Sequence, residues 1–178
     1  SGWDQGINLT DVSGVNVTAV NLSTNKRHVA ADLTSDNVTL QDSLVTDSQW
    51  SVSGVDIESA DSTVRNTKFR NNYDHLEVSG ARVNVTANRF ESPYAGNAQI
   101  NVQGGPTPNV TIEDNVLVGA IAGSIRGIDT DSGATDALVR NNTIRDTTLT
   151  AIAVGGEGSR VVENNVTDTV SGINLGFN

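Results

Sequence analysis

A short motif recurs along the whole chain, and its spacing constrains the fold more than any other feature. In each copy, two inward-type apolar residues flank one other residue, as in Ile-Asn-Leu at 7–9 and Val-Asp-Ile at 55–57. Successive copies begin 21 to 28 residues apart. The first apolar residues are Ile7, Val29, Val55, Leu76, Ile100, Ile128, Ile152 and Ile173. Self-similarity with a period of about 20–50 residues is typical of repeat architectures such as solenoids.

A second series keeps the same phase as the first. Its apolar anchors are Val17, Leu40, Val64, Val85, Ile112, Val139 and Val161. Five residues after each anchor comes another apolar residue, in the order Leu22, Val45, Phe69, Phe90, Leu117, Ile144 and Val166. Three residues after each anchor stand Val20, Ser43, Thr67, Asn88, Asn115, Asn142 and Asn164. We expect the four asparagines to take left-handed turn conformations and to form a ladder, in which each amide bonds the next one coil away.

These two series predict an all-β solenoid in which each repeat is one coil of three short strands. The strands alternate with period two and no helical pattern separates them, which argues against a βαβ fold. A β-sandwich is the competing architecture, because it too has a turn every 8 to 12 residues or so. The constant phase over seven coils favours the solenoid. Coils stacked about 4.8 Å apart would align the apolar residues into one core.

The repeats Gly-Ile-Asn-Leu at 6–9 and Val-Arg-Asn-Asn-Thr-Ile at 139–144 resemble those of right-handed parallel β-helix proteins. That group includes pectate lyases, polygalacturonases, mannuronan epimerases, phage tailspikes and periplasmic copper-loading proteins. The resemblance implies a right-handed parallel β-helix of about seven to eight coils in a single domain, 1–178. It identifies a scaffold, and the activity has to be argued from the site. Neither end carries an amphipathic capping helix, so we expect a fragment of a longer protein, or end-to-end or homo-oligomeric contacts at uncapped coils.

The amino-acid composition restricts the classes of partner that the chain can bind. The 21 acidic residues, mostly Asp, outnumber 11 basic ones and give a formal net charge of −10. This disfavours nucleic acid, because phosphate binding needs clustered basic side chains, and an Asp-rich, Lys-poor surface resembles halophilic archaeal proteins. Cysteine and methionine are absent, which excludes disulfides and sulfur ligands for metals. The sequence contains no run of about 18 apolar residues, so it predicts no membrane insertion. Eight Asn-x-Ser/Thr triplets permit glycosylation and fit an extracellular or cell-surface location.

The residue between the two apolar residues of each motif should face solvent, as should those beside them. Stacking then places Asp56 next to Glu77, with Asn101 and Asp129 continuing the row. Outward residues predicted to bind substrate are Asp56, Gln99, Asn101, Gln103 and Arg126. Like charges at such spacing recruit a cation or raise a carboxyl pKa, so Glu77, Asp129 and Asp131 are predicted Ca²⁺ ligands. The segments 91–98, 103–109, 118–126 and 131–137 border this sheet and predict a groove over coils four to six.

The segment 73–77 (Tyr-Asp-His-Leu-Glu) resembles the Tyr, Asp and His arrangement of mannuronan epimerases and related lyases. The resemblance implies that Tyr73, His75 and Glu77 act in proton transfer at a uronate. The same segment also suits an ordinary turn before a strand. Four aromatic residues, Trp3, Trp50, Tyr73 and Tyr94, offer faces for stacking on sugar rings or cover the edges of the core.

Two functions of different classes follow. The first is an exported carbohydrate-interacting domain, belonging to a polysaccharide lyase or epimerase that acts on anionic glycans, with Ca²⁺ screening the surface. The second is a structural stalk or adhesin module without catalysis, in which Asp56, Glu58, Glu77, Asp129 and Asp131 are merely solvated surface. A polysaccharide or cell-surface glycan is the expected partner in the first case.

Overall fold

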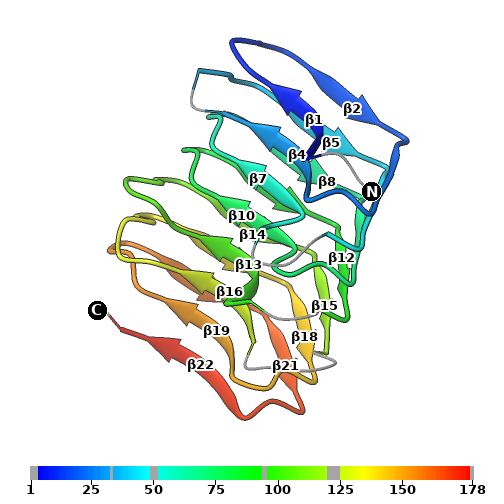
Figure 1. Ribbon diagram of the computed structural model, residues 1–178. Helices are drawn as coiled ribbons and strands as arrows, with labels where there is room; N and C mark the ends of the chain where they lie inside the picture. The colour runs from blue at the N-terminus through cyan, green and yellow to red at the C-terminus, as the bar shows by residue number, and fades with distance from the viewer. Residues whose placement is uncertain (1–3, 33, 49–51, 94–95, 120–124, 177–178) are drawn as a thin grey trace.

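The chain winds into a stack of coils whose strands form three parallel sheets, as a computed structural model shows (Figure 1). The structure describes residues 4–32, 34–48, 52–93, 96–119 and 125–176, so Trp3, Trp50 and Tyr94 lie outside the described residues. Each coil contributes one strand to each sheet. The described strands make seven full coils and the first strand of an eighth, which confirms the predicted architecture.

The first sheet has eight strands, each of which begins a coil. They are β1 (Gln5–Leu9), β4 (Arg27–Ala31), β7 (Val55–Ile57), β10 (Leu76–Val78), β13 (Ala98–Val102), β16 (Arg126–Thr130), β19 (Thr150–Val154) and β22 (Ser171–Leu175). The order in space equals the order in sequence, and all the pairs are parallel. The seven-stranded second sheet consists of β2 (Asn16–Thr18), β5 (Thr39–Gln41), β8 (Thr63–Arg65), β11 (Asn84–Thr86), β14 (Thr111–Glu113), β17 (Leu138–Arg140) and β20 (Arg160–Val162).

The third sheet completes each coil. Its strands are β3 (Asn21–Ser23), β6 (Leu44–Thr46), β9 (Lys68–Arg70), β12 (Arg89–Glu91), β15 (Val116–Val118), β18 (Thr143–Arg145) and β21 (Asn165–Thr167). The strand register pairs apolar residues with apolar residues of the next coil: Ile100 pairs with Ile128, Val85 with Ile112, and Phe90 with Phe69. The predicted apolar columns therefore lie in one interior, where the rings of Phe69 and Phe90 stack with centroids 4.6 Å apart. Burying these columns is the main favourable contribution to folding.

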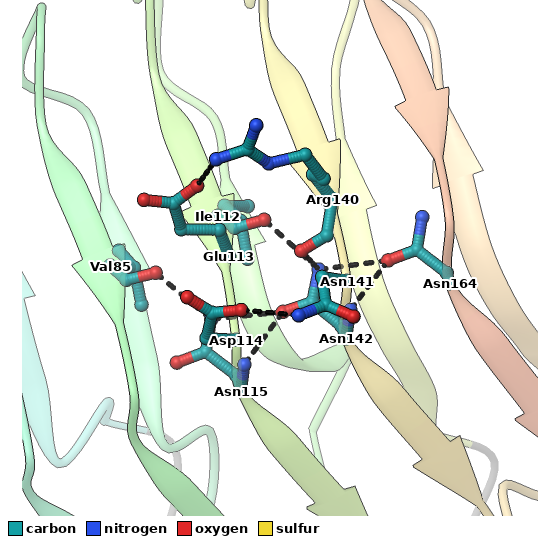
Figure 2. Close-up of polar contacts among 9 residues, drawn as sticks. All are labelled: Val85, Ile112, Glu113, Asp114, Asn115, Arg140, Asn141, Asn142 and Asn164. Atoms are coloured by element: carbon teal, nitrogen blue, oxygen red, sulfur yellow. Dashed lines mark hydrogen bonds and ion pairs between the residues drawn. The ribbon is translucent and has the colours of Figure 1, made fainter.

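The corner between the second and third sheets contains the predicted asparagine ladder (Figure 2). Asn88 donates to Asn115, Asn115 to Asn142 and Asn142 to Asn164, with N···O distances of 3.1, 3.0 and 2.9 Å. The same acceptor oxygens also receive backbone N–H groups of the preceding coil.

One detail of the ladder prediction was wrong. The left-handed residues at this corner are those immediately before the ladder, such as Asp114 (φ 58°) and Asn141 (φ 53°). The left-handed residue bends the chain, and this bend turns the next side chain inward, where the buried amide bonds backbone groups that would otherwise lack partners.

The described large apolar side chains that are exposed lie in or beside β22, which has a strand neighbour on one side: Val170, Ile173 and Leu175. The predicted end-to-end contact stays a prediction. No helix among the described residues has the length and hydropathy to cross a membrane.

Candidate functional site

On the outer face of the first sheet, each strand contributes the side chain that lies between its two inward residues. The register places them in one row, which we call the outward row: Asn8, Ala30, Asp56, Glu77, Asn101, Asp129, Ala153 and Asn174. Asp56, Glu77, Asn101 and Asp129 are consecutive, as predicted. Parallel strands stand about 4.8 Å apart, so neighbouring side chains in the row lie close together. Glu77 and Asp129 are half-exposed, whereas Asp56 and Asn101 are buried.

The predicted outward orientation of His75 and Gln99 is wrong, because both side chains are fully buried. Where the paired strands extend ahead of the inward pair, the ladder skips one residue just before it. Ala98 pairs with Arg126 and Ile100 with Ile128, while Gln99 has no such pairing. This skip shifts the alternation by one residue, so two consecutive side chains point inward. Residues one position earlier take the outward place instead, which brings Arg27, Ser53 and Arg126 to the outer face.

His75 packs against the edge of the two stacked phenylalanines, with ring centroids 6.1 Å from Phe69 and 5.8 Å from Phe90. Its Nδ1 accepts a hydrogen bond from Asn72 Nδ2 (3.0 Å), whose orientation is set by the backbone groups of Val45 and Ser48. Burial lowers the pKa of His75 to about 3. The side chain is therefore neutral and faces the interior, out of reach of a polymer on the outer face.

Tyr73 and Asp74 precede β10 in the turn that leads into the outer face. Tyr73 is half-buried, and its backbone N–H donates to Ser48 Oγ. Asp74 accepts hydrogen bonds from the backbone N–H groups of Asn97 (2.8 Å) and Ala98 (3.3 Å), so it holds the start of the next coil in position. Burial raises the pKa of Asp74 to about 6, although the two N–H groups oppose that shift. The predicted cluster of Tyr73, His75 and Glu77 thus divides between a turn, the core and the outer face.

Asp56 and Glu77 form the centre of the outward row. Ser53 Oγ donates to one oxygen of Glu77 (2.8 Å) and Gln103 Nε2 to the other (2.9 Å). Arg27 lies 3.3 Å from Asp56, whose side chain is 8% exposed. Burial raises the pKa of Asp56 to about 6; Arg27 opposes the shift, and Glu77 and Glu58 add to it. Sequence reasoning missed Arg27 and Ser53, although each lies three residues before an outward-row residue, as Arg126 does.

The predicted calcium ligands do not converge. Glu77 and Asp129 are separated by the strand of Asn101, hence by about 9.6 Å across two strand spacings. Asp129 pairs with Arg126 (2.7 Å), and Asp131 accepts the backbone N–H of Gly133 (2.9 Å). Within the described ranges, no three His, Asp or Glu side chains gather in a way that would hold a metal ion.

Among the described residues, two hollows lie on this face. Neither is centred on coils four to six, where the groove was predicted. The larger, of about 450 Å³, lies over coils six to eight between β16, β19 and β22, and we call it the C-terminal hollow. The smaller, of about 100 Å³, lies over coils one to three between β1, β4 and β7, and we call it the N-terminal hollow. Parts of the segments expected to wall a central groove, 94–95 and 120–124, fall outside the described residues.

The fold thus defines this protein as a parallel β-solenoid. Its first sheet carries a polar row and two hollows on the outer face. A family model described as "Right handed beta helix region" matches residues 5–177. The chain belongs to this right-handed β-helix family. Comparison with curated proteins and with solved structures gave no match.

Proposed function

We propose that this chain is a glycan-binding β-helix domain that works outside the cell and lays a polysaccharide along the outer face of its first sheet. The observation that carries the proposal is the outward row, which sets amide and carboxylate groups in line along the axis of the solenoid. Hydroxyl groups both donate and accept hydrogen bonds, so a row of amides and carboxylates suits a polyhydroxylated chain. The seven sequon asparagines that lie outside the outward row are all exposed, in keeping with export.

Binding is better supported than catalysis. A general base has to reach the proton that it removes, and His75 is fully buried in the core beside two phenylalanine rings. Asp56 and Glu77 remain on the outer face, and hydrogen bonds from Ser53 and Gln103 hold Glu77 in place. Side chains fixed in this way lose little entropy when a ligand binds.

A stalk without a ligand is the second candidate, and the outer faces of the other two sheets favour it. There, charged side chains pair with each other across the surface, as Arg140 does with Glu113 (2.5 Å) and Lys68 with Glu91 (2.8 Å). Such a surface serves a spacer well. On the first sheet, however, Asp56 is buried and partly offset by Arg27, which differs from the freely solvated carboxylates that a stalk predicts.

Calorimetric titration with a panel of neutral and uronate oligosaccharides, with and without Ca²⁺, tests the proposal. The double variant Glu77→Ala/Asp129→Ala should weaken binding at least tenfold, because it removes the two half-exposed carboxylates of the outward row. The control Asn84→Ala/Thr111→Ala changes exposed or half-exposed residues of the second sheet and should bind normally. Lack of binding across the whole panel would refute glycan recognition in favour of the stalk.

A further inference from the structure

The outward row is polar except at two places, and each exception coincides with a hollow. Ala30 is the second of the eight residues and lies at the N-terminal hollow. Ala153 is the seventh and lies at the C-terminal hollow. A methyl group fills far less space above a sheet than the Asp, Glu or Asn side chains of the other strands. The two alanines therefore account for the position of the two hollows.

The two hollows share their polar components. Beside Ala30, the row has Asn8 on one side and Asp56 on the other, with Arg27 bonded to Asp56. Beside Ala153, the row has the same two residue types in reverse order, Asp129 and then Asn174, and Arg126 is bonded to the aspartate.

Each hollow thus combines a small apolar floor, one amide and one carboxylate held by an arginine. The amides of Asn8 and Asn174 make no side-chain hydrogen bond to any other residue that the structure describes, so both have capacity for a ligand.

The two hollows lie on the same face and are connected by polar groups. Five strand steps separate β4 from β19, a distance of about 24 Å at 4.8 Å per step. Between the alanines the row runs through Asp56, Glu77, Asn101 and Asp129. An extended ligand that follows the axis would pass from one hollow to the other over Glu77 and Asp129, the two half-exposed residues of this stretch; Asp56 and Asn101 are buried.

We infer that the two hollows are paired subsites that hold two separate sugar units of a single neutral glycan chain. This inference rests on the proposed function and names its ligand class. The reason for a neutral chain is electrostatic. Each arginine is already paired with an aspartate, and the rims add Asp32 and Glu58 at one hollow and Asp131 at the other. A uronate carboxylate would meet net negative charge at both subsites, whereas hydroxyl groups donate to carboxylates and both donate to and accept from amides.

Filling each hollow separately tests the pairing. Ala153→Phe blocks the larger hollow and Ala30→Phe the smaller, while Thr86→Phe places the same ring on the second sheet as a control. Asn174→Ala and Asn8→Ala are smaller changes that keep the test valid should a phenylalanine disturb folding. The probes are neutral gluco-oligosaccharides of increasing length, with oligogalacturonates of equal length for comparison.

The wild-type affinity should rise with the length of the neutral oligosaccharide until the chain spans both hollows, since the second contact is then intramolecular. Filling either hollow should reduce the affinity for long chains at least tenfold, to the level of short ones, and Thr86→Phe should leave it unchanged. If long chains bind the filled variants as tightly as wild type, or if oligogalacturonates bind better than neutral chains, the paired neutral subsites are refuted while glycan binding stands. If neither class of oligosaccharide binds wild type, the proposed function itself fails.

Discussion

The molecule has two polar rows with the same spacing of one residue per coil, and they differ in what their polar groups bond. In the asparagine ladder, each middle amide forms hydrogen bonds with neighbouring amides and with backbone groups, as Figure 2 shows for Asn115 and Asn142. In the outward row, Glu77 is held by Ser53 and Gln103, but the amides of Asn8 and Asn174 bond no other residue in the described part of the chain.

The difference shows that periodicity alone does not mark a binding surface. Repetition every coil is a property of the fold, and both rows have it. A buried polar group has to find its partners within the protein, because leaving it unpaired is costly. An outward polar group has water as an alternative partner, so a ligand can replace that water. The following variants contrast the two rows, beginning with the largest expected effect.

Truncating the ladder should be the most damaging change. Asn115→Ala removes the acceptor of the Asn88 backbone N–H (2.9 Å) and the donor to the Val85 carbonyl (2.9 Å), and both groups are buried. We expect the free energy of unfolding, measured by urea denaturation, to fall by about 3 kcal/mol, since each orphaned buried group costs roughly 1–3 kcal/mol. The control Asn84→Ala, at an exposed asparagine of the neighbouring β11, should cost about 0.5 kcal/mol or less. Equal losses in the two variants would contradict a structural role specific to the ladder.

The pH dependence of stability should separate an inward from an outward residue of the same sheet. The pKa of His75 falls from 6.5 to about 3 on folding. Its contribution to stability is therefore complete above pH 6.5 and is lost as the pH falls towards 3, by roughly 1.4 kcal/mol per pH unit. The pKa of Asp56 rises from 3.8 to about 6, so this residue has the opposite effect: stability increases as the pH falls from 6 to 3.8.

Urea denaturation at several pH values between 7 and 4.5 checks both signs. His75→Leu should lose less stability on acidification than wild type, and Asp56→Asn should lose more. His28 is also buried and neutral, with a pKa lowered to about 4, so His75→Leu should retain part of the slope. Curves parallel to wild type for both variants would show that neither group changes its pKa on folding.

Removing one charge from the outward row should have the smallest effect on stability. Glu77→Gln keeps the shape of the side chain and relieves repulsion with the adjacent Asp56. We expect the free energy of unfolding to change by about 0.5 kcal/mol or less, with no loss. Repeating the denaturation in high salt should reduce the difference from wild type, because salt screens the repulsion. A loss comparable to that of Asn115→Ala would show that Glu77 belongs to the framework.

The stacking itself was predictable because hydrophobic periodicity has few physical solutions. Two series of apolar residues in constant phase require coils that lie on one another, and the pairing of Asp56 with Glu77 and of Asn101 with Asp129 follows directly from that stacking. The site was less predictable. The additional inward side chain before the inward pair, as at His75 and Gln99, depends on how neighbouring coils hydrogen-bond and has no signature in a strict alternation of period two.

By itself, then, the sequence determined the solenoid, the membership of each column and the order of the outward row, because these depend only on the spacing of residues along the chain. The tertiary structure decided which of the flanking side chains face outward, that the hollows lie over the two alanines away from the centre, and that Arg27 and Arg126 pair with aspartates beside them. Those features depend on side-chain volume and on contacts between coils, since a hollow exists only where residues distant in sequence leave space that none of them fills.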